Sequence, residues 1–181
     1  MSKSLVLVDI QNDYFPDGAM ELNGMDAAAA RASAVLESFR ARGWPVFHVQ
    51  HLSTRPGASF FLPDTHGAEH HASVAPRAGE TVVRKHFPNG FRDTTLQAEL
   101  DAAGARELVI VGAMSHMCID ATTRAAFDLG YACTVIADAC ATRDLAFGGT
   151  SVPAASVHAS FMAALSSPYA QVVAADAWLA A

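Results

Sequence analysis

The sequence predicts an α/β fold in which a mainly parallel sheet is covered by helices on both faces. Short apolar runs rich in β-branched residues alternate with longer segments of helical pattern, which is typical of βαβ units. The chain has 181 residues, of which 51% are hydrophobic, so it is long enough to bury one sizeable core. We therefore expect a single domain over 1–181, a three-layer α/β/α sandwich with a Rossmann-like sheet of about six strands.

Six short apolar runs are the predicted strands. In chain order they are LVLVDI (5–10), VFHVQ (46–50), TVVRK (81–85), ELVIVGA (107–113), CTVIAD (133–138) and QVVAA (171–175). Most consecutive runs are separated by helical segments rather than by tight turns, so we expect them to pair in parallel.

Four segments between these runs have a helical pattern, at 25–42, 93–103, 118–130 and 153–165. They end at a Gly or before a Pro, which is typical of helix C-termini. Asp93, followed by Thr-Thr-Leu, is the expected N-cap of the second helix.

The segment 52–79 does not fit the alternation, because it is too long for an ordinary connection between a strand and a helix. We expect it to form a lid or the wall of a pocket. Adjacent Phe residues such as its Phe60-Phe61 pair are more often part of a small satellite core than of a ligand site. Together with Tyr14, these residues are nevertheless candidates for the wall of a substrate pocket.

The charge of the chain argues against several classes of partner. It has 12 Lys and Arg, 18 Asp and Glu and a formal net charge of -6, without a basic run. Such a chain repels a phosphate backbone or an anionic membrane, so we expect neither partner. No apolar stretch approaches the roughly 20 residues that span a bilayer, and SLVLVDI (4–10) is too short for a signal segment. We expect a cytoplasmic protein that binds a small molecule.

Three cysteines are present, Cys118, Cys133 and Cys140. Their odd number and the lack of a C-x-x-C pair argue against a disulfide framework and against a thiolate zinc site. Cys133, inside a predicted strand, and Cys140, in the turn expected after it, are interpreted as inert packing residues.

Three reactive side chains fall at the carboxyl ends of predicted strands, where open parallel sheets form their binding crevices. Asp9 ends the first strand, Lys85 ends the third, and Cys118 follows the fourth at a helix start. The helix dipole and an ammonium group favour a thiolate, and Asp9 could carry its proton to a leaving group. An Asp cap and a solvated Lys are the commoner roles of such residues, so position alone leaves both interpretations open.

Three ordered motifs resemble the isochorismatase-like cysteine hydrolase family, which includes nicotinamidases, N-carbamoylsarcosine amidohydrolases and ureidoacrylate amidohydrolases. The family's D-x-Q-x-D opening is similar to LVLVDIQNDYF, and its K-x-x-x-S-A-F segment is similar to KHFPNGFRDTTLQAEL. Its nucleophile strand, helix and following strand resemble LVIVGAMSHMCIDATTRAAFDLGYACTVIADACAT. The resemblance covers nearly the whole chain.

The resemblance implies roles for the matching positions. Cys118 would be the nucleophile, Asp9 the proton shuttle and Lys85 the cation that orients them. A cis peptide bond between Ala113 and Met114 would turn the amides of Met114 and Cys118 toward one oxyanion hole. No organic cofactor is required, and the resemblance implies a homo-oligomer, a dimer or tetramer.

The chain departs from the family pattern in two motifs. Asn89-Gly90 stands where Ser-Ala is usual, so the loop after Lys85 or a substrate contact is expected to differ. Ser115-His116 stands where Thr is usually followed by Asp or Asn. His116 either changes the polarity of the pocket or faces solvent. His158 has no partner that the sequence identifies, so we expect a packing or surface role.

A metal site must be considered because six of the eight histidines lie between positions 48 and 86. They are His48, His51, His66, His70, His71 and His86. Nicotinamidases of the family hold a metal with an Asp-x-His pair, where this chain reads Val49-Gln50-His51. Gln is a poor substitute for a carboxylate ligand, so we expect no metal.

The expected function is hydrolysis of a small amide, ureido or carbamoyl C–N bond through an acyl-enzyme on Cys118. Two alternatives stay open. One is hydrolysis of a vinyl ether such as isochorismate, which some family members perform without the cysteine. The other is a non-catalytic thiol sensor or interaction protein on the same scaffold.

Overall fold

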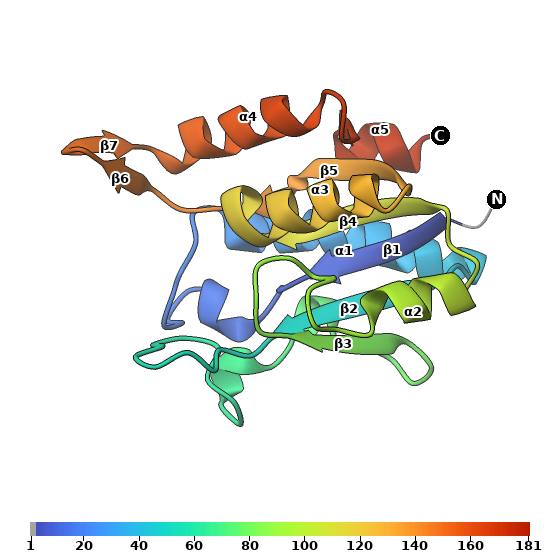
Figure 1. The fold of residues 1–181 in the computed structure, drawn as a ribbon, viewed down its shortest axis with the longest axis horizontal. Coiled ribbons are helices and arrows are strands. Elements are labelled where there is room, and N and C mark those ends of the chain that lie inside the picture. Colours follow the sequence, from blue (N-terminus) through green and yellow to red (C-terminus); the bar gives the residue numbers. More distant parts are fainter. Residues whose placement is uncertain (1–2) are drawn as a thin grey trace.

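The computed structural model describes residues 3–181, and its centre is a six-stranded sheet in which every strand pairing is parallel (Figure 1). The strands follow the order β3-β2-β1-β4-β5-β8. Their bounds are β1 (Lys3–Val8), β2 (Val46–His51), β3 (Thr81–Lys85), β4 (Glu107–Ala113), β5 (Ala132–Ala141) and β8 (Gln171–Val173). The predicted parallel sheet is confirmed.

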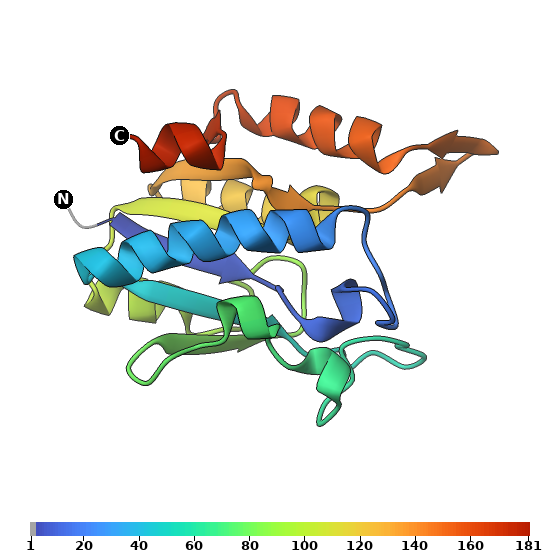
Figure 2. The ribbon, with the colours of Figure 1, turned by 180° about the vertical axis from the view of Figure 1, so that it is seen from behind.

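Helices cover both faces of this sheet (Figure 2). They are α1 (Met25–Arg42), α2 (Leu96–Ala102), α3 (Asp120–Asp128), α4 (Ala154–Leu165) and α5 (Ala175–Leu179). Buried residues of α1 and α5 share one apolar cluster with the sheet, and those of α2, α3 and α4 share the other. The predicted three-layer sandwich is therefore confirmed, with α5 as a helix that the sequence pattern did not indicate.

The N-terminal boundary of α2 differs from the prediction. Asp93 has a φ of +54° and α2 begins only at Leu96, so Asp93 is not the N-cap. The hydroxyl of Thr94 instead accepts a hydrogen bond from the Leu96 amide at 3.3 Å and donates one to the Gly90 carbonyl at 2.6 Å. The chain turns at Asp93 before the helix starts, which is why a simple spacing rule places the cap too early.

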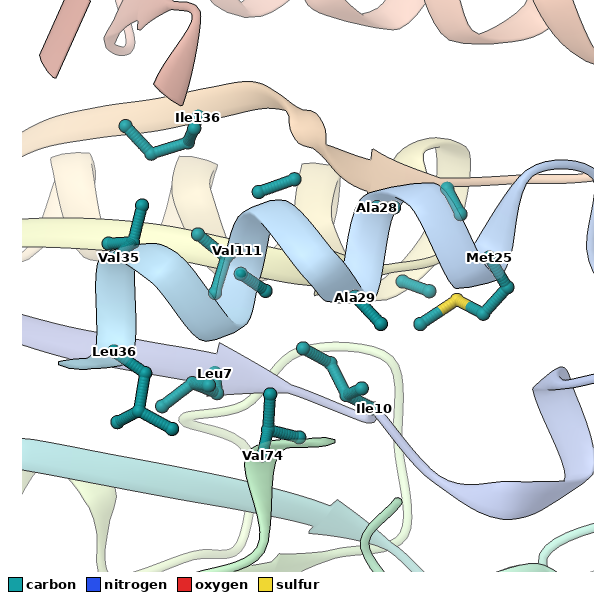
Figure 3. Close-up of a cluster of buried hydrophobic side chains, with 14 of the residues drawn as sticks. Leu7, Ile10, Met25, Ala28, Ala29, Val35, Leu36, Val74, Val111 and Ile136 are labelled. Atoms are coloured by element: carbon teal, nitrogen blue, oxygen red, sulfur yellow. The ribbon is translucent and has the colours of Figure 1, made fainter. Parts of the chain in front are cut away.

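The core between α1 and the sheet depends on small side chains. Ala28 and Ala29 are buried on the helix face that lies over the strands, where Val111 and Ile136 project from β4 and β5 (Figure 3). Short side chains let a helix pack close to a sheet, and the larger Leu36 fills the space toward β1 and β2. The Ala-rich sequence of α1 is therefore used for packing within the chain.

Gly112 allows the ends of β4 and β1 to approach each other. Its φ is +125°, and a Cβ at this position would collide with the carbonyl oxygen of Val8. The pairing of β4 with β5 shifts at the same place, because Ile110 pairs with Val135 whereas Gly112 pairs with Cys140. Cys140 thus lies inside the irregular strand β5, not in the turn that we expected after a shorter strand.

Glu80 joins α1 to the edge of the sheet. Arg40 donates two hydrogen bonds to its carboxylate at 2.6 and 2.8 Å, the Arg77 amide donates one at 2.8 Å, and His48 Nε2 lies 2.9 Å away. Burial alone would raise the pKa of Glu80, but these partners outweigh it and hold the pKa at about 2. Because the carboxylate is only 13% exposed, this pairing is only weakly screened by solvent.

We expect Glu80→Gln to lower the free energy of unfolding at pH 7 by about 2–3 kcal/mol. A carboxyl group whose pKa is depressed on folding stabilises the protein above its unfolded pKa, and this contribution is lost as the pH falls through its folded pKa of about 2. The difference between variant and wild type in urea unfolding should therefore shrink between about pH 5 and pH 2. Glu37→Gln, which removes an exposed partner of the same Arg40, is the matched control and should change little. Equal effects of the two variants would contradict this account.

Two segments extend from the sandwich at the carboxyl end of the sheet. The segment 52–79 contains the short 3-10 helices His66–Ala68 and Ala72–Val74. The antiparallel strands β6 (Leu145–Phe147) and β7 (Thr150–Val152) form a hairpin that projects beyond the rest of the molecule (Figure 1). Within residues 3–181, no helix combines the length and the apolar character needed to cross a membrane.

Candidate active site

Asp9, Lys85 and Cys118 meet at the carboxyl ends of the strands. The chain runs outward from β1 through β2 to β3 and then returns to place β4 on the other side of β1, so the strand order reverses between β1 and β4. Asp9 directly follows β1, and Cys118 lies in the single π-helical turn Ser115–Ile119 between β4 and α3. Lys85, the last residue of β3, reaches the same point. The three side chains therefore meet just beyond the carboxyl ends of the strands, beside the point where the strand order reverses, as their strand-end positions predicted.

The ammonium nitrogen of Lys85 is the centre of the cluster. It lies 2.7 Å from Asp9 Oδ2, 3.2 Å from Cys118 Sγ and 2.8 Å from His51 Nδ1. The side chains of Asp9 and Lys85 are fully buried, and Cys118 is 4% exposed. Each of the three N–H groups of the ammonium therefore has an acceptor, and the three acceptors fix the position of Nζ.

The site favours a protonated thiol and a charged amine at rest. Burial raises the pKa of the Cys118 thiol, and the carboxylate of Asp9 raises it further, whereas Lys85 lowers it. Burial lowers the pKa of Lys85, but Asp9 and Cys118 outweigh burial and leave this pKa above its ordinary value. We expected the helix start and the ammonium to favour the thiolate, but desolvation and Asp9 together exceed them.

Hydrogen bonds to the Met114 carbonyl hold the turn that carries Cys118. The peptide bond between Ala113 and Met114 is cis, and the Met114 carbonyl accepts hydrogen bonds from the amides of Met117 and Ile119 at 3.0 and 3.2 Å. Within residues 3–181 the Met114 amide itself donates no hydrogen bond. That amide is consequently free to donate to a group bound beside Cys118.

Two polar pairs connect this turn to later parts of the chain. Ser115 Oγ lies 2.8 Å from His158 Nδ1 of α4 and donates to the Ala141 carbonyl at 3.2 Å, so His158 has a buried polar partner that the sequence did not reveal. His116 Nδ1 lies 2.6 Å from Thr142 Oγ1, and its ring is half-buried. Ser115 and His116 therefore join the turn that carries Cys118 to the end of β5 and to α4.

The first motif supplies two positioning residues to which the sequence analysis gave no role. Gln11 is fully buried, donates to the carbonyls of His51 and Ala68 at 2.9 and 2.8 Å, and accepts from the His51 amide at 2.8 Å. Asp13 accepts a hydrogen bond from the Phe61 amide at 2.6 Å. Polar residues stand at every second position of this motif, and this pattern was the sequence feature that could have indicated the positioning role. Each acts on a segment far along the chain, so the sequence did not show the partner.

The predicted pocket aromatics gather in one cluster. The ring of Tyr14 lies 4.5 Å from that of Phe61 and 6.0 Å from that of Phe60, and Phe61 lies 5.9 Å from the ring of His51. Burial raises the pKa of Tyr14, and the nearby Cys118 and Asp9 raise it further. Phe61 is completely buried and packs against the rings of Tyr14 and His51. His116 belongs to another contact, since its ring lies 6.0 Å from that of Phe161.

Asn89 and Gly90, which stand where the family usually has Ser and Ala, make contacts that shape the loop after Lys85. The Gly90 amide donates to Thr122 Oγ1 of α3 at 3.0 Å, and a Cβ at Gly90 would lie 3.1 Å from the same oxygen. Asn89 Oδ1 accepts from the Phe91 amide at 2.9 Å. These residues hold the loop against α3 and have no hydrogen bond to Asp9, Lys85 or Cys118 within residues 3–181.

Most histidines of positions 48–86 have different partners, although the rings of His48 and His70 lie 5.5 Å apart. His66 lies 2.9 Å from Glu69, His71 lies 2.8 Å from Ser73, and His86 lies 2.7 Å from the Leu52 carbonyl oxygen. Asp9, His51 and Cys118 do offer ligand atoms within 4.8 Å of one another. Lys85 Nζ lies within hydrogen-bond distance of all three, so its ammonium occupies the position from which a cation would contact them.

Comparisons with known proteins show the family of the chain. The isochorismatase domain model matches residues 3–177. The isochorismatase family protein YddQ of Bacillus subtilis is 50% identical over 179 residues, 99% of each chain. A streptothricin hydrolase of Streptomyces noursei is 40% identical over 143 residues, 79% of this chain and 51% of that protein. The ureidoacrylate amidohydrolase RutB of Variovorax paradoxus is 30% identical over 188 residues, 86% of this chain and 73% of that protein.

Solved structures show the same fold. A protein of Oleispira antarctica, assigned as an isochorismatase hydrolase, superposes with a TM-score of 0.96 at 54% identity, covering 99% of this chain and 97% of that one. An N-carbamoylsarcosine amidase of Thermoplasma acidophilum superposes with a TM-score of 0.82 at 27% identity, covering 97% of this chain and 98% of that one. The chain belongs to the isochorismatase family of hydrolases.

Proposed function

We propose that the protein hydrolyses a small amide, ureido or carbamoyl compound at a C–N bond through a covalent acyl-enzyme on Cys118. The observation that carries this proposal is the convergence of Cys118, Asp9 and Lys85 on one buried point, with Lys85 Nζ 2.7 Å from the carboxylate and 3.2 Å from the thiol sulfur. The names of three relatives, a ureidoacrylate amidohydrolase, a streptothricin hydrolase and an N-carbamoylsarcosine amidase, support the same bond class.

Acylation begins with transfer of the Cys118 proton to Asp9. Asp9 Oδ1 is buried and has no hydrogen-bond partner among the described residues, so it is available as the acceptor. The thiolate sulfur attacks the substrate carbonyl carbon, and the carbonyl π electrons move to oxygen. When this tetrahedral species collapses, the C–N bond breaks, and the leaving nitrogen takes the proton from Asp9.

In deacylation, water attacks in place of the thiolate, and Asp9 again accepts a proton and then donates it. Asp9 removes a proton from water as the water oxygen attacks the thioester carbon. The C–S bond then breaks, the acid product leaves, and the sulfur regains the proton from Asp9. Lys85 stays charged throughout and stabilises whichever of its two partners is anionic.

The tetrahedral oxyanion needs hydrogen-bond donors close to Cys118. We assign this role to the backbone amides of Met114 and Cys118, as the family resemblance implies. The free amide of Met114 supports the assignment, because a donor that is unpaired in the resting protein loses no bond when the oxyanion forms.

The test is release of ammonia from a panel of primary amides, ureido compounds and carbamoyl compounds, with release of pyruvate from isochorismate measured in parallel. Ammonia from at least one nitrogen compound, with its rate proportional to enzyme concentration, is the expected result. Turnover of isochorismate alone would contradict the proposal and favour vinyl ether hydrolysis. No turnover of any compound, combined with slow alkylation of Cys118, would favour a non-catalytic protein.

We also propose that the chain forms a homo-oligomer, a dimer or tetramer. The projecting β6–β7 hairpin supports this proposal, because the Phe147 side chain at its tip is 89% exposed. A second copy that covered the Phe147 side chain would bury a large apolar area.

Sedimentation equilibrium should show Phe147→Ser shifted toward the monomer, because the substitution removes the most exposed large apolar side chain of the described residues. Leu129→Ser, which alters a 44% exposed residue at the end of α3, is the control and should leave the association unchanged. A wild-type protein that is monomeric at micromolar concentration would contradict the proposal.

A further inference from the structure

We infer that His51 is a positioning residue that holds the Lys85 ammonium between Asp9 and Cys118 and offers its ring N–H to an acceptor on the substrate. The inference deepens the proposed function and rests on it. It concerns a histidine that the sequence analysis considered only as a candidate metal ligand.

The contact with Lys85 determines the proton arrangement of the His51 ring. Lys85 Nζ lies 2.8 Å from His51 Nδ1, and an ammonium group can only donate. Nδ1 must therefore be unprotonated and accept, which places the single ring proton on Nε2. The pKa of His51 is lowered to about 4 by burial and by the charge of Lys85, so this neutral form persists at neutral pH.

The three donors of the buried ammonium then have three acceptors. Asp9 takes one, Cys118 takes one and His51 takes the third. Without His51, one N–H of a fully buried cation would lose its partner, which disfavours the charged amine. A weaker positive charge beside Cys118 disfavours the thiolate, so a change at His51 is transmitted to the nucleophile through Lys85.

The backbone of His51 is fixed independently of its ring. The buried carboxamide of Gln11 bonds to both the amide and the carbonyl of His51, at 2.8 and 2.9 Å. The ring itself lies 5.9 Å from that of Phe61. Both contacts restrict the direction of the side chain, which is what a positioning role requires.

The second ring nitrogen is available to a ligand. Within residues 3–181 His51 Nε2 has no hydrogen-bond partner, and it is not one of the unpartnered atoms that are buried from solvent. Its N–H would suit a carbonyl or carboxylate oxygen of the substrate. The charged and titratable groups whose fields reach the ring are Lys85, Asp9, His86 and Arg55.

The positioning role is tested by the rate at which iodoacetamide alkylates Cys118, measured by mass spectrometry of the Cys118 peptide as a function of pH. His51→Leu removes the acceptor, so we expect the rate at neutral pH to fall by about tenfold or more and the midpoint of the profile to move to higher pH. His51→Asn can retain an acceptor oxygen near the position of Nδ1 and should stay within about threefold of wild type. A His51→Leu profile that overlaps the wild-type profile would overturn the inference.

The substrate role of His51 is tested separately from the positioning role, by measuring turnover of any compound that the wild type hydrolyses. His51→Asn keeps the contact with Lys85 but has no donor at the Nε2 position, so its kcat/KM should fall by about tenfold while alkylation of Cys118 is retained. Unchanged kcat/KM in this variant would remove the substrate role. Failure of the proposed function would instead appear as no turnover by the wild type, and the alkylation profiles would still test the positioning role.

Proton-detected NMR of the wild-type protein labelled with 15N-histidine tests the same arrangement without a substitution. We expect one ring, assigned to His51 by its loss in either variant, to carry its proton on Nε2 at pH 7 and to keep this form down to pH 5. A proton on Nδ1 of His51 would overturn the inference, because the Lys85 contact would then have no acceptor.

Discussion

Replacing Cys118 by Ala should reduce the release of ammonia by a factor of at least about 10⁴ while leaving the fold intact. The substitution removes the sulfur that forms the acyl bond in the proposed mechanism, whereas the backbone amides and the Asp9–Lys85 pair remain. The substitution replaces the buried thiol by a hydrogen atom, which is a small change of volume, so the free energy of unfolding should change by less than about 1.5 kcal/mol. A coupled ammonia assay and thermal unfolding by circular dichroism measure the two effects.

The other two cysteines provide matched controls. Cys133 and Cys140 are buried and free, and burial raises the pKa of each thiol to about 12. Neither has a hydrogen bond to Asp9 or Lys85 in the described part of the chain, so Cys133→Ala should retain turnover. Full activity of Cys118→Ala would contradict the mechanism, and loss of activity in Cys133→Ala at unchanged stability would contradict the assignment.

Replacing Lys85 by Met should cause the largest loss of stability among the site variants. The substitution leaves the carboxylate of Asp9 fully buried without its cation, which typically costs about 3–5 kcal/mol. It also removes the charge that favours the thiolate, so turnover should be lost. Urea unfolding at pH 7 together with the ammonia assay measures both consequences.

A double variant separates the two consequences of this substitution. Adding Asp9→Asn to Lys85→Met removes the uncompensated charge, so we expect much of the lost stability to return. Activity should not return, because the proton shuttle and the cation are both absent. A double variant that is no more stable than Lys85→Met alone would contradict the view that the ion pair is the source of the stability change.

The sheet and the convergence of Asp9, Lys85 and Cys118 could be predicted from the sequence because both depend on a periodic pattern. Alternating apolar runs and helical segments indicated parallel strands, and parallel strands bring their carboxyl ends to the same edge. Asp9, Lys85 and Cys118 each stand at or directly after such an end. No knowledge of side-chain contacts was required to place them together.

The features that the sequence did not predict depend on contacts between distant segments. The protonated state of Cys118 follows from its desolvation and from Asp9, which outweigh the nearby ammonium. The role of His51 requires the 2.8 Å contact with Lys85, 34 positions along the chain. Cys140 lies in β5 because of a register shift against Gly112, which no local pattern signals.

The most direct measurement of the central claim is transfer of the acyl group to hydroxylamine. If Cys118 forms a thioester, hydroxylamine should intercept it, so the hydroxamate or hydroxyurea product rises with hydroxylamine concentration at the expense of the hydrolysis product. No such product should form with Cys118→Ala. Ammonia release that yields only the hydrolysis product at every hydroxylamine concentration would show direct attack by water and would contradict the account.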